Sequence, residues 1–231
     1  MKLITKIMLL GFISSFSFAQ KKGTWVSLTD GKTFNNWHVY NKAGQAITDK
    51  WKIVDGAMVF SGKGKGEPHG DDLVSDKEYE NFELELEWKI SEGGNSGIFY
   101  GVFEDKKYGV PYLTGPEIQV LDNERHPDAK EGKNGNRKAG SLYDMIPSAS
   151  EAKPAGSWNK VRIIKNKGQI TVYQNDKLAV SYPTEGSQWD AMVADSKFKT
   201  WQGFGKYAKG KIGLQDHGDV VSYRNIRIKE L

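Results

Sequence analysis

Cysteine is absent from this sequence, so neither a disulfide framework nor a lipid anchor attached through cysteine can form. No block of Lys and Arg with interleaved aromatic residues indicates a nucleic-acid partner. Internal repeats and low-complexity linkers are also lacking, and so is the alternation of strands and helices that predicts a parallel sheet. These absences favour a single domain without a parallel sheet.

The longest apolar run lies at the N-terminus, and it predicts a secretory signal peptide over residues 1–19. Two lysines flank its start, and Ser17 and Ala19 place small residues where signal peptidase reads the chain. The run is shorter than the roughly 20 apolar residues that span a bilayer. We therefore expect cleavage before Gln20, a single mature domain at 20–231 without an integral membrane segment, and a periplasmic or extracellular location. Loss of the two lysines lowers the net charge from +4 to +2.

Short alternating strands dominate the rest of the chain. Phe82–Ile90 alternates apolar residues with glutamate and lysine, which is typical of a strand with one buried and one solvated face. Trp51–Phe60 carries Asp55-Gly56 at its centre, a strong hairpin signal. Only 189–198 has apolar residues at helical spacing. The pattern predicts an all-β, jelly-roll β-sandwich of two antiparallel sheets with one short helix, and a barrel is the alternative.

A strand is also expected at 96–103, with Ile98, Tyr100 and Val102 on one face. Two glycines lie inside it. Glycine within a strand indicates a bulge or the close approach of another group, so this strand is expected to be irregular.

The stretch from Gly115 to Asp122 combines a strand pattern with chemistry. Successive side chains of a strand point to opposite faces, so Glu117 and Gln119 share one face while Ile118 and Val120 share the other. A carboxylate and an amide on one rigid face can bind a sugar or transfer a proton. A plain solvated face of an antiparallel sheet is the competing interpretation.

Six motifs follow one another in order at Asn95–Tyr100, Glu117–Asp122, Gly140–Asp144, Trp158–Val161, Gly213–Gly218 and Tyr223–Lys229. Together they resemble the 3-keto-disaccharide hydrolase domain family, over about 23–231. The resemblance implies a concanavalin A-like lectin/glucanase sandwich, secretion, and activity on glycosides whose C3 hydroxyl is oxidised to a ketone. Members are expected to differ in the loops 62–72 and 123–138.

A 3-keto glycoside can be cleaved without an oxocarbenium-like transition state. The ketone acidifies the proton on C2, the glycosidic oxygen on C1 leaves by elimination, and water then adds. This route needs a base at C2, a group that holds the enolate oxygen, and an acid beside the leaving oxygen.

The motifs supply candidates for each role. Glu117, Asp122 and His217 are the candidate catalytic acids and bases. Hydrogen-bond donors for an oxyanion or a sugar are available among the amides and the arginine of the motifs. The expected substrate-binding residues are Gln119, Asn95, Arg224, Tyr143, Asp144 and His126.

Two other functions stay open on the sequence. The same sandwich can serve as a lectin-like carbohydrate-binding module. An ordinary two-carboxylate glycosidase would use Glu117 with Asp122, but their separation of five places them on opposite faces of a regular strand. No cofactor is required by the sequence. A divalent metal ion is possible, with His126 and His217 as further donors, although no His-x-x-x-His spacing occurs.

Overall fold

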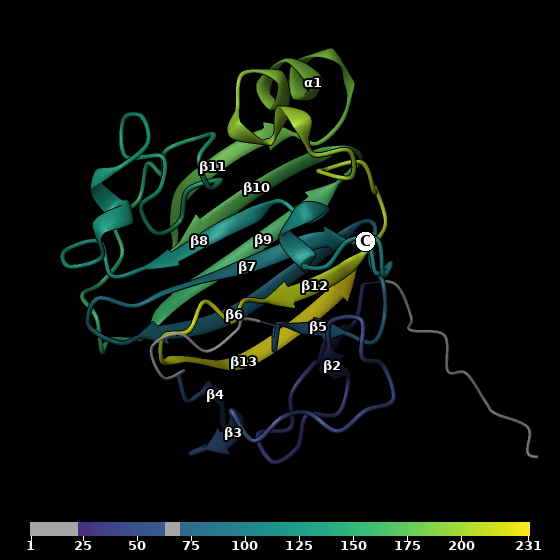
Figure 1. Ribbon diagram of the computed structural model, residues 1–231, viewed down its shortest axis with the longest axis vertical. Coiled ribbons are helices and arrows are strands. Elements are labelled where there is room, and N and C mark those ends of the chain that lie inside the picture. The colour runs from purple at the N-terminus through teal and green to yellow at the C-terminus, as the bar shows by residue number, and fades with distance from the viewer. Residues whose placement is uncertain (1–22, 63–69) are drawn as a thin grey trace, which may run out of the picture.

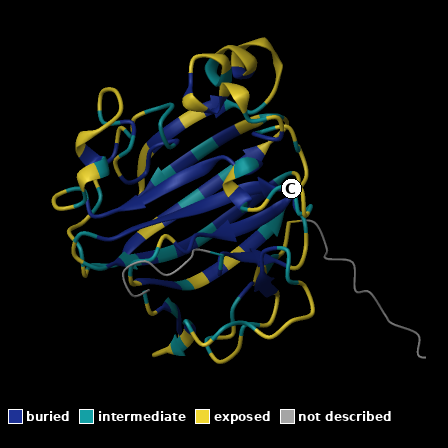
Figure 2. Ribbon diagram, in the orientation of Figure 1, coloured by how far each residue is buried: buried dark blue, intermediate teal, exposed yellow. Residues whose placement is uncertain are grey.

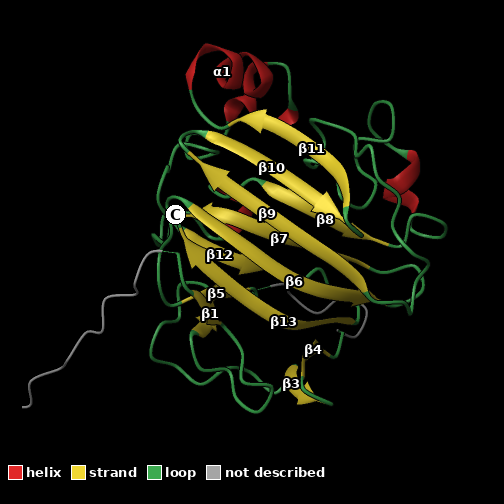
Figure 3. Cartoon of the chain, turned by 180° about the vertical axis from the view of Figure 1, so that it is seen from behind, coloured by secondary structure: helices red, strands yellow, loops and turns green. Residues whose placement is uncertain are grey.

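In the computed structural model, which describes residues 23–62 and 70–231, two antiparallel β-sheets pack face to face (Figure 1). The larger sheet has the order β11-β10-β9-β6-β13-β4-β3, with β1 paired to β13, and the smaller has the order β2-β5-β12-β7-β8. Figure 3 shows the larger sheet from its outer side. The predicted all-β sandwich is confirmed, and the barrel is excluded because neither sheet path closes on itself.

The larger sheet comprises β1 (Trp25–Ser27), β3 (Trp51–Val54), β4 (Ala57–Phe60), β6 (Phe82–Ile90), β9 (Asn159–Asn166), β10 (Gln169–Gln174), β11 (Lys177–Pro183) and β13 (Val221–Glu230). The smaller sheet comprises β2 (Trp37–Val39), β5 (Leu73–Ser75), β7 (Asn95–Val102), β8 (Glu117–Leu121) and β12 (Lys211–Leu214). The helices are α1 (Gly186–Ala194) and the 3₁₀ helices η1 (Pro111–Leu113), η2 (Pro127–Lys130) and η3 (Lys197–Thr200).

The strongest strand and turn patterns are confirmed. β6 has the predicted bounds, and its glutamates lie on the outer face of the larger sheet, where Glu85 pairs with Arg227. The Asp55-Gly56 hairpin joins β3 to β4, and both turn residues have positive φ, as a two-residue turn of this kind requires. Alternation and turn chemistry therefore set these elements locally.

The predicted helix at 189–198 is wrong in its bounds. α1 begins earlier, at Gly186, and ends at Ala194, and the separate 3₁₀ helix η3 follows. Ser196 breaks the continuity, because its hydroxyl accepts a hydrogen bond from the Phe198 N–H at 3.1 Å. Side chains of this type compete with the helical hydrogen-bond pattern. The break redirects the chain, so that η3 comes over the smaller sheet.

The prediction that Val102 shares a face with Ile98 and Tyr100 is also wrong. Gly101 has a φ of +64°, and the register between β7 and β12 shifts at this point. The bulge turns Val102 to the other face, where it packs with Phe99.

The smaller sheet is buried on both faces. One face meets the larger sheet across the main core, which contains Ile98, Ile118 and Val120. The opposite face lies under loops and short helices, so every residue of β7 and β8 is buried (Figure 2). This covering creates the enclosed space in which the candidate site lies.

The expected signal peptide at 1–19 and most of the loop at 62–72 lie outside the described residues. Of the helices at 23–62 and 70–231, none is both long enough and apolar enough to cross a membrane.

Candidate active site

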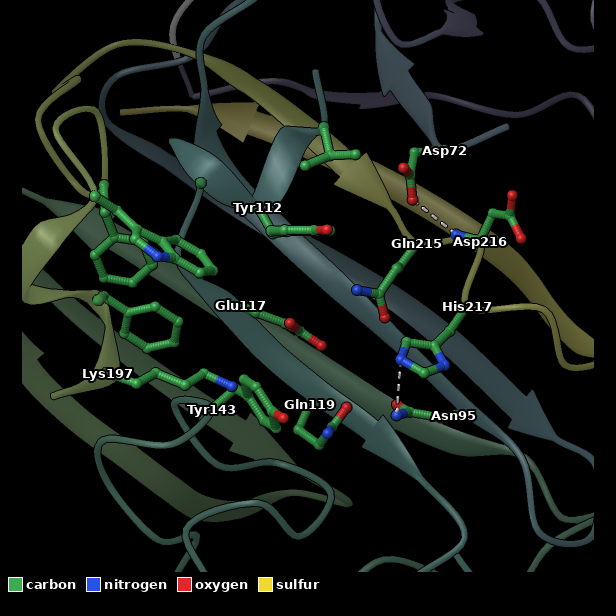
Figure 4. Close-up of a pocket in the computed structure, with 15 residues that line it drawn as sticks. Asp72, Asn95, Tyr112, Glu117, Gln119, Tyr143, Lys197, Gln215, Asp216 and His217 are labelled. Atoms are coloured by element: carbon green, nitrogen blue, oxygen red, sulfur yellow. Dashed lines mark hydrogen bonds between the residues drawn. The ribbon is translucent and has the colours of Figure 1, made fainter. Parts of the chain in front are cut away.

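A pocket of about 330 Å³ lies on the face of the smaller sheet that points away from the main core (Figure 4). Strands β7, β8 and β12 form its floor, and the segments around η1 and η3 form its walls. The described residues that line it are Asp72, Asn95, Val110, Tyr112, Gly115, Glu117, Gln119, Tyr143, Lys197, Phe198, Trp201, Phe204, Gln215, Asp216 and His217. One sugar ring fits a hollow of this size and mixed polarity.

Glu117 is the central acid of the pocket. The residue is only 9% exposed, and no described residue donates a hydrogen bond to its carboxylate. Burial raises its pKa to about 8, an effect that Lys197 opposes and that Asp128 and Asp72 reinforce. The interpretation of this strand as a solvated face is therefore wrong, and Glu117 is poised to exchange a proton near neutral pH.

Gly97 provides the space that the Glu117 carboxylate occupies. The two residues lie on neighbouring strands, and a Cβ added to Gly97 would stand 2.3 Å from Glu117 Oε1. No carboxylate can stay at that distance, so any larger residue must displace it. The close approach expected from a glycine inside this strand is confirmed.

We expect Gly97→Ala to lower turnover by about 10- to 100-fold, because small displacements of a reacting group are costly. The measurement is turnover together with the apparent pKa in the pH–rate profile, which should move as the carboxylate shifts. Gly109→Ala is the control, since nothing lies within 4 Å of its added Cβ. An unchanged rate for Gly97→Ala would show that this close contact does not position the acid.

Polar side chains continue the pocket floor on one side of Glu117. Asn95 lies 3.4 Å from His217, measured from Nδ2 to Nε2, and the rings of His217 and His126 meet edge to face at 6.3 Å. Gln119 lies on the same face as Glu117, as predicted. The sheet therefore brings three of the expected residues, Asn95, Gln119 and His217, to one pocket with Glu117.

Tyr143 forms part of the wall, also as predicted. Its hydroxyl donates a 2.9 Å hydrogen bond to Asp128, and the ammonium of Lys197 lies 4.0 Å from the centre of its ring. Burial and the bond to Asp128 raise the pKa of Tyr143, so the phenol stays protonated. An aromatic face held in this way can stack on a sugar ring.

Several lining residues were missed by the sequence analysis. Gln215 and Asp216 belong to the same motif as His217, so that motif was the available signal. Tyr112 and Trp201 carry no comparable signal, because isolated aromatic residues are more often part of a core. Lys197 lay inside a segment predicted as one continuous helix, and nothing in its neighbourhood indicated a site.

Asp122 does not reach the pocket, which corrects its assignment as a catalytic residue. Its carboxylate accepts hydrogen bonds from the backbone of Gly93 at 2.7 Å and of Glu124 at 3.1 Å. Burial acts to raise the pKa of Asp122, but these bonds and Arg125 outweigh it, and the pKa is lowered. The pairing of Glu117 with Asp122 in the two-carboxylate glycosidase alternative is therefore not formed, since Asp122 is committed to holding this turn.

Arg224 lies on the wrong side of the molecule for substrate binding. It projects from the outer face of the larger sheet, where it pairs with Glu87 at 2.7 Å and lies 4.0 Å over the ring of Trp158. Both sheets separate it from the pocket, so its expected role in substrate binding is also corrected.

The two remaining candidates lie beside the pocket rather than in its lining. The Asp144 carboxylate holds Arg137 at 2.5 Å and belongs to a neighbouring hollow. His126 begins η2, with its Nδ1 accepting a hydrogen bond from the Asp128 N–H at 3.2 Å. Across 23–62 and 70–231, no three His, Cys, Asp or Glu side chains gather closely enough to hold a metal ion.

The raised pKa of Glu117 links its ionisation to stability. The pKa of Glu117 is about 8 in the folded protein and 4.5 ordinarily. The stability that folding gains from the protonated carboxyl is therefore fully present below pH 4.5 and is lost as the pH rises through 8. Each unit of difference is worth about 1.4 kcal/mol. We expect the free energy of unfolding of Glu117→Gln, relative to the wild type, to increase by at least about 2 kcal/mol between pH 5 and 9. Urea unfolding at both pH values measures this, and a constant difference would contradict it.

Fold and site together define the class: a two-sheet sandwich whose smaller sheet carries a pocket of mixed polarity around the buried Glu117 carboxyl. Residues 24–229 match the 3-keto-alpha-glucoside-1,2-lyase-like domain, and the chain belongs to this family. The resemblance found in the six motifs is confirmed.

The similarity to individual proteins extends over most of the chain. This chain is 45% identical, over 229 residues, to a 3-keto-disaccharide hydrolase of Bacteroides thetaiotaomicron, and the match covers 90% of this chain and 78% of that protein. A Parabacteroides distasonis protein whose crystal structure is described as that of a glycosyl hydrolase is 32% identical to this chain. The two structures superimpose with a TM-score of 0.79 over 90% of this chain and 94% of that one. A Bacillus subtilis protein with a galectin-like fold, 16% identical, superimposes with a TM-score of 0.57 over 91% and 97% of the two chains, which shows the fold alone.

Proposed function

We propose that the protein cleaves 3-keto glycosides by removing the C2 proton, eliminating the C1 substituent and adding water to the product. The observation that carries this proposal is the buried Glu117 carboxyl, held over Gly97 in a pocket of sugar size. A carboxylate whose pKa is raised is a stronger base than an ordinary one, which suits the removal of a proton from carbon. The 3-keto-disaccharide hydrolase of Bacteroides thetaiotaomicron supports the choice of substrate class.

Two side chains carry the proton transfers in this proposal. Glu117 takes the proton from C2, because its carboxyl lies at the centre of the pocket floor. His217 gives a proton to the glycosidic oxygen as it leaves. The amides of Asn95, Gln119 and Gln215 line the same floor and are placed to bind sugar hydroxyls.

Water addition completes the net hydrolysis. Elimination leaves a double bond between C1 and C2, conjugated with the C3 ketone. Water adds to C1 and C2 regains a proton, so the same two side chains act in the reverse sense. No redox change occurs in either half of the reaction.

A comparison of two substrates tests the proposal. The protein is incubated with a 3-keto disaccharide and with the unoxidised parent sugar, and the released monosaccharide is measured. Release from the keto form alone is expected, because only the ketone acidifies C2. Equal release from the parent would contradict this chemistry, and binding of either sugar without release would instead indicate a lectin-like module.

We also propose that the protein acts after export, as the apolar run at 1–19 indicates. Mass spectrometry of protein from the periplasm or the medium should show a chain that begins at Gln20. An intact Met1 in that material would contradict cleavage at this position.

A further inference from the structure

Lys197 is the one Lys or Arg among the described residues that line the pocket. It is exposed at the pocket wall and forms no ion pair within 4 Å among 23–62 and 70–231. The nearby Arg137, in contrast, is held by Asp128 at 2.7 Å and by Asp144 at 2.5 Å. Lys197 is therefore the cation that remains available to a bound molecule.

Three of the titratable groups that line the pocket, Lys197, Glu117 and His217, stand in a definite order. Figure 4 shows Glu117 between Lys197 on one side and His217 on the other. Lys197 is held there by η3, with its ammonium over the Tyr143 ring, and His217 follows β12, beside Asn95. The order Lys197, Glu117, His217 thus comes from three separate segments of the chain.

A 3-keto glycoside requires three kinds of help at three consecutive carbon atoms. The C3 ketone oxygen needs a cation or donor as negative charge develops, C2 needs a base, and the oxygen on C1 needs an acid. The order of these needs along the sugar is the order of the three side chains along the pocket. The other polar residues of the lining are carboxylates (Asp72 and Asp216), amides and tyrosines, so no other lining cation competes for the oxyanion.

We propose that Lys197 is a catalytic residue that donates a hydrogen bond to the C3 ketone oxygen and stabilises the enolate. The bound sugar then lies with C3 toward Lys197, C2 over Glu117, and the glycosidic oxygen toward His217. This inference rests on the proposed function and adds the oxyanion-binding group and the direction of the substrate.

The electron and proton balance follows from this orientation. Glu117 takes the C2 proton, and the electron pair of the C–H bond moves into the C2–C3 bond, so that negative charge reaches the C3 oxygen beside the ammonium. When the ketone reforms, the pair moves to the C1–C2 bond, and the C1–O bond breaks. The departing oxygen takes a proton from His217.

The two half-reactions can be measured separately. Exchange of the C2 hydrogen for deuterium in D₂O, followed by NMR, reports formation of the enolate. Release of the leaving alcohol reports elimination. The variants are Lys197→Met, which removes the charge, Lys197→Arg, which retains it, and Lys199→Met, a control on the same 3₁₀ helix whose exposed side chain does not line the pocket.

We expect Lys197→Met to lose at least about 100-fold in both exchange and release, mainly in kcat, as removal of an oxyanion donor does. Lys197→Arg should recover part of the loss, and Lys199→Met should be silent. His217→Asn should lose release while retaining C2 exchange, because enolate formation lies at the other end of the substrate.

Full exchange and release by Lys197→Met would overturn the inference, and so would loss of C2 exchange in His217→Asn. An equal loss in Lys197→Arg and Lys197→Met would overturn a role for the charge, provided that both keep the wild-type thermal midpoint. These outcomes differ from failure of the proposed function, in which the wild-type protein itself releases nothing from a 3-keto glycoside.

Discussion

Replacement of Glu117 by Gln should lower turnover of a 3-keto glycoside by about 10³- to 10⁴-fold, the upper part of the range for a general base. Glutamine keeps the shape of the side chain over Gly97 but cannot take a proton. The wild type should show a pH–rate profile for kcat/KM that rises with pH until Glu117 is ionised, near pH 8, because its pKa is raised to about 8 by burial. In Glu117→Gln that rise should disappear.

Glu85→Gln is the matched control for this experiment. Glu85 lies on the outer face of the larger sheet, where it pairs with Arg227, and both sheets separate it from the pocket. Steady-state kinetics should find it nearly silent. Retention of most activity by Glu117→Gln, together with a large loss in Glu85→Gln, would mean that the active face is the outer one.

Replacement of His217 by Asn should lower the release of the leaving alcohol by at least about 100-fold. Asparagine can still hydrogen-bond to Asn95, but it cannot deliver a proton to the departing oxygen. The loss should depend on the substrate, because a good leaving group needs less help from an acid. We therefore expect the deficit to shrink for a 3-keto glucoside that carries a nitrophenyl leaving group.

The control for this second experiment is His126→Asn. His126 contacts the ring of His217 from outside the lining and begins η2. Its replacement should cost much less than that of His217. The thermal midpoint of both variants should be measured, since an equal loss of activity and stability in the two would point to a structural effect on the turn.

Some parts of the fold and the site could be predicted because their causes are local. The alternation of apolar and charged residues sets β6, and Asp55-Gly56 sets the hairpin between β3 and β4. Neither signal depends on the surrounding structure. Alternation along β8 likewise places Glu117 and Gln119 on one face. The motif around His217 likewise predicts the turn that follows β12.

Other parts depended on what packs against each segment. Asp122 lies only five positions from Glu117, yet backbone hydrogen bonds hold it in a turn outside the pocket. Arg224 belongs to a family motif, yet the register of β13 places it against Glu87 on the outer face. A motif names residues that occur together in sequence, and it does not say on which face of a sandwich each one projects.

The sequence by itself determined the β-sandwich class, the family and the strand face that carries Glu117, because periodicity, turn chemistry and motif order are written along the chain. Only the tertiary structure decided that this face is covered rather than solvated, since part of the coverage comes from the segment around η3, which is distant from Glu117 in sequence. That coverage raises the pKa of Glu117 to about 8. It also brings Lys197 to the same pocket. Burial and proximity are properties of packed segments, and no local pattern around Glu117 or Lys197 encodes them.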